Sequence, residues 1–501
     1  MDTLVMWAYR AWETVRARSR RVGVCGTRSW PFDAASRTKA HSGRQNIVFP
    51  RYLARNMRNR IDENKNLGVG MPFRRGWIAL LLFALAMINY IDRVTLSFAA
   101  GPIAKEYGLD PVSLGYLFSS FLWTYALFLI PMGLLVDRFG AKRVAGFGLT
   151  LWSLATAATG LSTGFASLLA TRLAMGAGEA TSNPAGARVI REWMPAGERG
   201  AMNAAFNSGS YAGPALCALV AGPIIEHYGW RALFFAAGAI GLLWLICWLS
   251  LFSRPEDARW LSEPERAKIL AERTGNTAAA GDRTGLVGML SSGPTLWGLA
   301  LTMGCNVYSQ YLFLTWLPSY LQTTKGLTIA KTGLYAAIPY TVAVVLCIGI
   351  GFLSDRMMRG EVGGGRRRYV IASTMMLAAT VLFAPFVDAV WLILALIAVS
   401  LTGIASTTSL TFSLVNDLLP NPRDIGVAMA FVVVGGNVFG LMAPIVTGYV
   451  IRATGSYDGA FYVAGALLIC GAASVLTLTH TPIGARRSEA ESEVAPLSQR
   501  I

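Results

Sequence analysis

Apolar runs of about 20 residues recur along this chain from Trp77 to His480, with only short polar breaks between them. A helix of that length spans the hydrocarbon core of a bilayer. The composition agrees, because 54% of the 501 residues are hydrophobic and 14% are charged, whereas a soluble domain carries about a quarter charged residues. The pattern predicts an all-α membrane protein.

A window of about 19 residues places twelve candidate spans in two groups of six. The first group lies near 77–100, 113–136, 143–163, 166–188, 203–225 and 231–252. The second group lies near 294–320, 332–353, 369–388, 390–414, 426–451 and 458–480. The predicted domains are therefore one six-helix bundle at 71–252, a central loop at 253–293 with a short helix from Pro264 to Arg273, a second bundle at 294–482 and a tail at 483–501.

An internal repeat supports two related bundles. Gly133-Leu-Leu-Val-Asp137-Arg138 closes the second span, and Gly351-Phe-Leu-Ser-Asp355-Arg356 closes the eighth. Asp137 and Asp355 lie 218 positions apart. Two pseudo-symmetric six-helix bundles are therefore expected, with the substrate bound between them near the middle of the membrane.

The distribution of positive charge predicts the orientation. Lysine and arginine cluster after spans two, four, six and eight, whereas the alternate loops hold scattered single charges such as Lys105, Lys325 and Arg452. By the positive-inside rule, both termini, the central loop and the tail face the cytoplasm of an inner (plasma) membrane. Residues 1–76 hold 16 Lys/Arg against 5 Asp/Glu, so the net charge of +16 does not indicate nucleic-acid binding. Residues 1–70 are expected to be a basic, disordered extension or an over-extended gene start.

Charged side chains inside an apolar span are costly, so each marks a candidate site. The run Asn89-Tyr90-Ile91-Asp92-Arg93 lies midway along the first span. Arg93 has a planar fork that fits a carboxylate, so it is the candidate substrate anchor. The alternative is a standing ion pair with Asp92 or Glu179. Neighbouring helix positions point about 100° apart, so Asp92 is a candidate for a separate proton-binding group.

The fourth span carries a second charged cluster. Arg172 and Glu179 lie seven positions apart, which is two helical turns and about 10 Å along one face. A buried carboxylate near arginines suits reversible protonation, so Glu179 is a candidate proton-coupling group. Gly176 and Gly178 are better explained by close helix packing.

Polar residues in other spans are candidates for bonds to substrate hydroxyls, although helix–helix hydrogen bonds use the same residue types. They are Tyr125, Asn207, Ser210, Tyr308, Gln310 and Asn437. A separate set is predicted to make gating contacts that break when the bundles move. This set comprises Gly133, Asp137, Arg138, Gly140 and Arg143, with Asp355 and Arg356 in the second half.

These motifs resemble a known family. The run Gly133–Arg143 resembles the signature loop of the major facilitator superfamily, and Gly351–Arg356 resembles its half-repeat. The run Asn89–Arg93, taken with Arg172 and Gly178-Glu179, resembles the anion:cation symporter family within it, whose bacterial members include hexuronate, galactonate and glucarate carriers. The resemblance extends from about Met71 to Pro482.

The resemblance implies a rocker-switch cycle in which Arg93 binds the substrate and Asp92 and Glu179 are protonation sites. It also implies that Tyr90, Tyr125 and Arg172 line the route. One position departs from the family: Phe412 stands before Asp417-Leu-Leu-Pro420, where the family often has tryptophan. That difference leaves the identity of the substrate open.

The predicted function is proton-coupled symport of a small organic anion by a monomer that needs no cofactor or metal. A sugar acid such as hexuronate, galactonate or glucarate is expected, with aromatic or other carboxylates as the alternative. An organophosphate exchanger is less favoured, because the seventh span, Pro294–Tyr320, has no Lys or Arg. A channel or receptor fits the repeat with buried charges less well. The sequence has no phosphate loop and no histidine at metal-ligand spacing, which argues against an enzyme or a primary pump.

Overall fold

The computed structural model describes residues 73–195, 198–258, 260–275, 285–357, 365–419 and 424–483, which contain helices and no strand. These helices belong to one unit, Met71–Ile501. Residues 1–70 and 484–501, for which the extension and the tail were predicted, lie outside the described residues.

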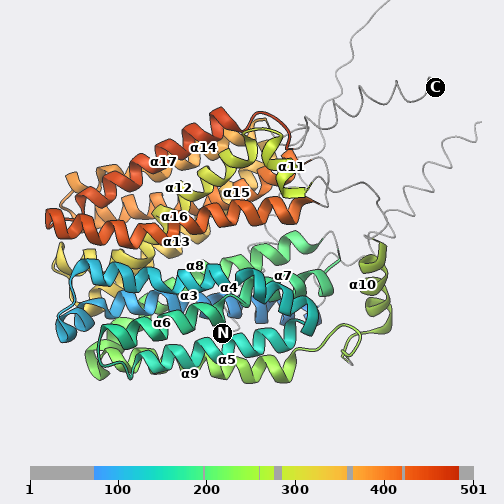
Figure 1. Ribbon diagram of the computed structural model, residues 1–501, viewed down its shortest axis with the longest axis horizontal. Coiled ribbons are helices and arrows are strands. Elements are labelled where there is room, and N and C mark those ends of the chain that lie inside the picture. Colours follow the sequence, from blue (N-terminus) through green and yellow to red (C-terminus); the bar gives the residue numbers. More distant parts are fainter. Residues whose placement is uncertain are drawn as a thin grey trace, which may run out of the picture. The chain divides into compact units, whose positions relative to one another are not determined.

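The helices of the first half pack on one another, with α3 against α8 and α5 against both α6 and α9 (Figure 1). The predicted fourth span is divided into α6 and α7, because Pro184 has no N–H to donate to the carbonyl of Ala180. The helices of this bundle are α3 (Phe73–Tyr107), α4 (Pro111–Phe139), α5 (Ala141–Thr159), α6 (Phe165–Glu179), α7 (Ser182–Trp193), α8 (Arg199–Tyr228) and α9 (Trp230–Leu251).

The second half forms a bundle of its own, in which α12 packs against α16 and α17 and α15 packs against α13 and α14. The predicted ninth span is an α-helix followed by a 3₁₀ helix. The elements are α12 (Thr295–Thr323), α13 (Ile329–Met357), α14 (Arg367–Ala378), η2 (Ala379–Phe386), α15 (Val390–Leu418), α16 (Ile425–Thr454) and α17 (Asp458–Leu478).

Two short helices, α10 (Glu263–Gly275) and α11 (Gly285–Ser291), lie between the bundles in sequence, and α10 confirms the predicted helix in the central loop. The loop is docked on the first bundle. Arg75 at the start of α3 donates to Glu265 of α10 at 2.7 Å and to Glu198 before α8 at 2.6 Å. The rings of Trp193 and Trp260 stack with centroids 5.2 Å apart.

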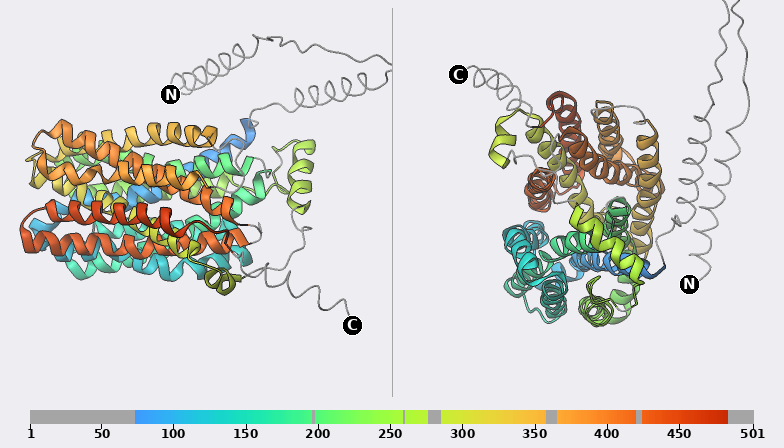
Figure 2. Two further views of the ribbon diagram at one scale, coloured as in Figure 1. Left: turned by 90° about the horizontal axis from the view of Figure 1, so that it is seen from above. Right: turned by 90° about the vertical axis from the view of Figure 1, so that its right-hand side faces the viewer.

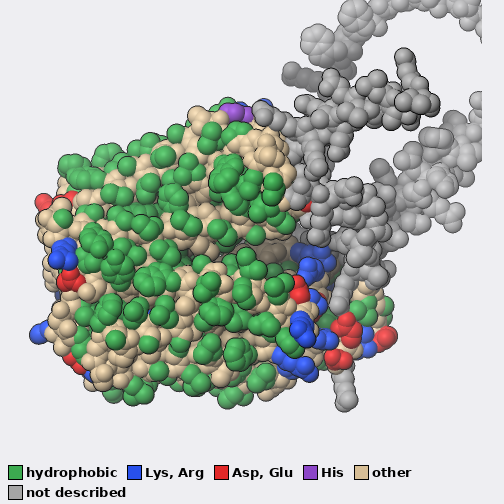
Figure 3. All heavy atoms as spheres, in the orientation of Figure 1, with side chains coloured by type: hydrophobic (Ala, Val, Ile, Leu, Met, Phe, Trp, Pro, Cys, Tyr) green, Lys and Arg blue, Asp and Glu red, His purple; other side chains and the backbone are tan. Residues whose placement is uncertain are grey.

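Nine helices of the described residues are long and apolar enough to cross a membrane. The other three crossings are α5, the α6–α7 pair and α12, whose polar residues are largely covered by neighbouring helices. A helix inside a bundle does not need to be apolar on every face. Hydrophobic side chains cover the sides of the bundles, and charged ones gather at the two ends (Figure 3). Twelve crossings in two six-helix bundles confirm the predicted fold class.

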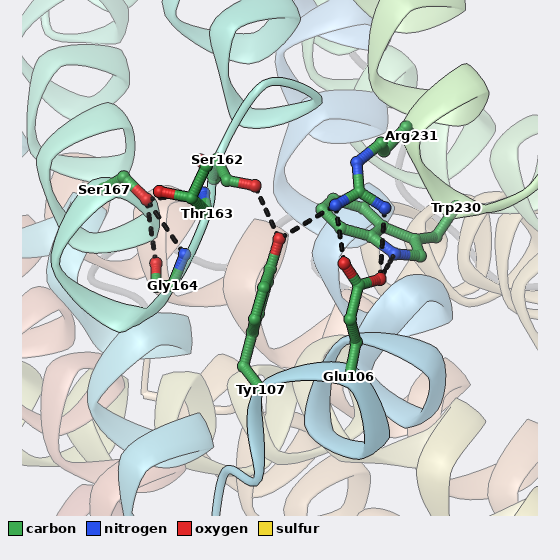
Figure 4. Close-up of polar contacts among 8 residues, drawn as sticks. All are labelled: Glu106, Tyr107, Ser162, Thr163, Gly164, Ser167, Trp230 and Arg231. Atoms are coloured by element: carbon green, nitrogen blue, oxygen red, sulfur yellow. Dashed lines mark hydrogen bonds and ion pairs between the residues drawn. The ribbon is translucent and has the colours of Figure 1, made fainter.

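Hydrogen bonds tie the helices of the first bundle together at the end where α3 terminates, here called the far end (Figure 4). The carboxylate of Glu106 accepts from Arg231 at 2.6 and 3.1 Å and from the indole of Trp230 at 2.8 Å. The hydroxyl of Tyr107 donates to the carbonyl of Ser162 in the α5–α6 loop at 2.5 Å. These bonds connect α3 to α9 and to that loop, so they hold the far end of the first bundle together.

The two bundles lie side by side (Figure 2): α3 contacts α12, and two more extensive crossings join α4 to α16 and α8 to α13. Both crossings are closest near the far end and depend on glycine. A Cβ on Gly333 of α13 would lie 2.2 Å from the carbonyl oxygen of Ala218, and one on Gly448 of α16 would lie 2.5 Å from that of Pro111. The surface is hollowed between the bundles toward the opposite, or near, end, where α3 begins (Figure 3).

Candidate functional site

The guanidinium of Arg93 lies where the two bundles meet at mid-depth and is only 6% exposed. Its Nε donates to Glu179 Oε2 of α6 at 2.9 Å, and its Nη1 donates to the hydroxyl of Tyr311 of α12 at 3.1 Å. Three rings surround the guanidinium carbon, with the centroid of Tyr90 at 4.7 Å and those of Phe121 and Tyr125 at 5.1 Å. Such cation–π contacts offset part of the cost of removing the charge from water. The ion pair with Glu179 is the one that the sequence offered as the alternative to substrate anchoring.

Glu179 is fully buried, and close helix packing puts it there. A Cβ on Gly176 would lie 2.0 Å from the carbonyl oxygen of Phe121 in α4, and one on Gly178 would lie 2.7 Å from that of Gly148 in α5. The prediction that these two glycines serve packing is confirmed. Oε1 of Glu179 has no hydrogen-bond partner among the described residues. One carboxylate oxygen thus holds Arg93, while the other is available to bind a proton.

Asp92 and Arg93 point in different directions, as their adjacent helix positions predicted. Asp92 is fully buried, with Trp152 and Thr156 of α5 facing its carboxyl group, whose two oxygens make no hydrogen bond within the described part of the chain. Arg172 donates from both Nη atoms to the backbone carbonyl of Asp92, at 3.1 and 3.3 Å, and is 2% exposed. In this state Arg172 therefore fixes the turn of α3 that carries Asp92 and Arg93.

Tyr90 and Tyr125 are brought to Arg93, and the hydroxyl of Tyr125 accepts from Asn183 at 2.8 Å. The remaining candidates for substrate hydroxyls make no contact with Arg93 in the described interactions. On α8, Asn207 is exposed and Ser210 is half-buried. Gln310 of α12 and Asn437 of α16 are half-buried. The buried hydroxyl of Tyr308 has no hydrogen-bond partner among the described residues. Their roles in binding remain predictions.

Tyr311 was not predicted from the sequence, although a signal for it was present. Tyr311 lies 218 positions after Arg93, the same offset that relates Asp137 to Asp355. The two residues therefore occupy equivalent positions in the two repeats, and they meet where the bundles meet. Phe121, which completes the aromatic surroundings of Arg93, gave no comparable signal.

One face of α15 was also missed. Its side chains at Thr408, Ser409, Phe412, Ser413 and Asn416 are not buried, whereas the intervening positions are. The spacing i, i+1, i+4, i+5, i+8 marks one side of a helix. Asn306 of α12 donates to Thr408 at 2.9 Å, so this side borders the interior of the bundle. A face so rich in hydroxyls is disfavoured against lipid, and we place it toward the hollow between the bundles.

The predicted gating residues lie at the near end. Asp137 accepts from Arg188 at 3.0 Å and lies 3.9 Å from Arg191, and Arg188 also pairs with Glu192. Gly140 ends α4 with φ +84°, a conformation that favours glycine, and Gly133 is half-buried within α4. Arg138, Arg143 and Arg356 are exposed, and the side chain of Asp355 lies outside the described residues.

Comparison with known proteins identifies the family. A sequence model of the Major Facilitator Superfamily matches residues 82–423 and 364–500. A probable galactarate/D-glucarate transporter of Escherichia coli K12 is 31% identical over 81% of this chain and 93% of its own length. A D-galactonate transporter of E. coli O6:H1 is 30% identical over 81% of this chain and 96% of its own length.

The fold agrees with that assignment. A crystal structure of a D-xylose–proton symporter superposes with a TM-score of 0.62 at 15% identity, covering 81% of this chain and 98% of that one. The matched segments cover most of the chain. The protein therefore belongs to the Major Facilitator Superfamily and is a multi-pass transporter of the inner membrane rather than an enzyme.

Proposed function

We propose that this transporter carries a sugar acid together with protons by alternating access. The observation that carries the proposal is the buried ion pair between Arg93 and Glu179 of the first bundle, whose arginine also donates to Tyr311 of the second bundle. The names of the relatives support a sugar-acid substrate, namely galactarate, D-glucarate or D-galactonate. Aromatic carboxylates and organophosphates are the competing substrates.

Competition for Arg93 provides the coupling. The guanidinium has five N–H donors in a planar fork, and Glu179 occupies one of them. A substrate carboxylate binds to the same positive charge of Arg93, so it binds best once protonation has removed the negative charge of Glu179. Substrate and proton thereby favour each other's binding, which is the thermodynamic requirement for symport.

Charge balance extends the argument to the number of protons. Asp92 and Glu179 balance Arg93 and Arg172 when both acids are ionised, and all four are buried. A bound carboxylate adds one negative charge, and one proton restores neutrality in a region where net charge is costly. A dicarboxylate held entirely inside the protein would take a second proton, for which Asp92 is the available site.

The remaining parts of the proposal follow from the architecture. By the positive-inside rule the near end faces the cytoplasm, so the state we propose for this structure is open to the inside. The units that rock are the bundles 71–252 and 294–482, joined by 253–293, and both termini are cytoplasmic. Substrate hydroxyls are bound by Asn207, Ser210, Tyr308, Gln310 and Asn437, together with the hydroxyl-bearing face of α15. The protein works as a monomer.

Uptake by purified protein in liposomes tests the proposal. With an acidic outside, galactarate, D-glucarate or D-galactonate should accumulate above the external concentration, and a protonophore should abolish the accumulation. Benzoate and glycerol 3-phosphate, offered under the same gradient, should not accumulate by this route. Equilibration that ignores the proton gradient would contradict symport, and transport of benzoate or glycerol 3-phosphate alone would replace the sugar acid.

A further inference from the structure

We propose that Tyr311 is a substrate-binding residue, the contact through which the second bundle holds the carboxylate bound to Arg93. The inference rests on the proposed function and names a ligand for the same site. It starts from the hydrogen bond that Arg93 Nη1 of α3 donates to the Tyr311 hydroxyl of α12, 3.1 Å away. This bond joins the two bundles at mid-depth.

The hydroxyl of Tyr311 has a proton left to donate. A phenol carries one O–H donor and can accept in addition. Its oxygen accepts from Arg93, and within the described residues no acceptor takes its own proton. Arg93 likewise uses only two of its five N–H donors in the described contacts. A carboxylate placed against the free donors of Arg93 can accept from Tyr311 at the same time.

The ring of Tyr311 is held in place for this task. It is 5% exposed, and its centroid lies 6.3 Å from that of Phe121 across the bundle interface. On its other side, a Cβ on Gly440 of α16 would lie 2.9 and 3.0 Å from two ring carbons. Gly440 therefore provides the space that the ring occupies, and a larger residue there must displace the ring.

Symmetry explains why this residue suits a moving carrier. Arg93 and Tyr311 occupy equivalent positions of the two repeats and contact each other, so they lie near the pseudo-two-fold axis that relates the bundles. Because they also lie at mid-depth, they are close to the fixed central site around which the bundles rock. Groups near a pivot change their separation least when the bundles rock. A carboxylate held by both residues can therefore keep both contacts through the transition, and it connects the bundles while they move.

Counterflow by Tyr311→Phe in liposomes tests the inference. The variant keeps the ring and loses only the hydroxyl, so KM for galactarate should rise about tenfold, which corresponds to about 1.4 kcal/mol. The maximal rate of counterflow should stay unchanged, and so should the dependence of net uptake on the proton gradient, which is measured separately. Galactarate and D-glucarate have the same two carboxylates and differ in hydroxyl configuration, so the rise should be equal for both. Ser409→Ala, on the α15 face, should instead affect the two substrates unequally.

Two further variants separate binding from structure. Tyr320→Phe removes a buried hydroxyl from the same helix, away from Arg93, and should leave KM unchanged. Gly440→Ala should raise KM in the wild-type background. It should cause little further rise in KM in the Tyr311→Phe background, because both changes act through the hydroxyl of Tyr311. An unchanged KM in Tyr311→Phe, or a rise that differs between the two substrates, would overturn the inference. If the wild type accumulates no sugar acid, the proposed function is wrong. If the wild type does accumulate sugar acid but only Arg93 variants lose affinity for it, the proposed function stands and the role of Tyr311 is wrong.

Discussion

At the scale of the residue, the candidate site is a buried arginine, Arg93, that binds Glu179 and lies against Tyr311 and Phe121. Arg93, Asp92 and Glu179 stand out because an ionisable group in an apolar run is costly wherever it points. Tyr311 and Phe121 do not stand out, because aromatic residues are common in membrane helices and only the packing of the bundles places them on Arg93. The position of Arg172 against the backbone of Asp92 was likewise beyond prediction, since a helical pattern shows which face a residue occupies but not the atom it contacts.

Replacing Arg93 by lysine tests the anchor at this scale. Lysine keeps the charge but lacks the planar guanidinium that can bind Glu179, Tyr311 and a carboxylate at once. KM for the sugar acid should therefore rise at least about tenfold, which corresponds to about 1.4 kcal/mol. Initial rates of counterflow over a range of substrate concentrations measure the effect. Arg231→Lys is the matched control, because Arg231 binds Glu106 at the far end. A wild-type KM in Arg93→Lys would remove Arg93 from the substrate site.

At the scale of the element, the number of spans was predicted and their interruptions were not. Hydropathy averages over about 19 residues, so it treats 166–188 and 369–388 as single spans. The break after α6 and the change to 3₁₀ geometry at η2 arise from backbone hydrogen bonds that averaging hides. Two glycines of α8 also serve close packing: a Cβ on Gly209 or Gly213 would lie 2.5 or 2.4 Å from a carbonyl oxygen of α3. Which helix each one contacts was not predictable from one sequence.

The far-end crossing of α8 and α13 can be opened by one side chain. Gly333→Leu should prevent close contact with Ala218 and shift the carrier away from the state seen here, lowering uptake at least about tenfold. Gly349→Leu is the control on the same helix, because no heavy atom lies within 4 Å of a Cβ placed there.

A cross-link reports the crossing state directly. The hydroxyls of Tyr116 and Tyr449 lie 3.3 Å apart at the neighbouring α4–α16 crossing. Cysteines placed at these two positions should therefore be joined, in the wild-type and Gly349→Leu backgrounds, by a bifunctional thiol reagent long enough to replace the two rings, since a direct disulfide needs closer backbones. They should bridge poorly with Gly333→Leu. Equal cross-linking in all three backgrounds would show that Gly333 does not control closure of the far end.

At the scale of the whole molecule, the repeat predicted two bundles with a central site, but not which end would be closed. Both states of a carrier are encoded by one sequence and differ by a small free energy, so no pattern of residues selects one of them. Gly333 lies against Ala218 and Gly448 against Pro111, so the bundles meet closely at two far-end crossings, while a cavity of about 450 Å³ lies between α3, α4, α12 and α16 at the same end. In the cycle that we propose, this state is open toward the near end, where the Glu179 proton would be released in symport.

The coupling of that release to movement is tested by Glu179→Gln. Glutamine resembles the protonated acid and cannot lose a proton, so Arg93 stays available for substrate while the empty carrier lacks the ion pair that we propose it needs to return. Net accumulation driven by a pH gradient should fall to background. Counterflow should continue, because exchange of one substrate molecule for another does not require the proton to leave.

The two assays are run on liposomes with equal protein content, and Arg93→Lys, which weakens substrate binding, should lower both accumulation and counterflow. Accumulation that stays proton-driven in Glu179→Gln would move the coupling site to Asp92, and loss of both activities would assign Glu179 the structural role of holding Arg93.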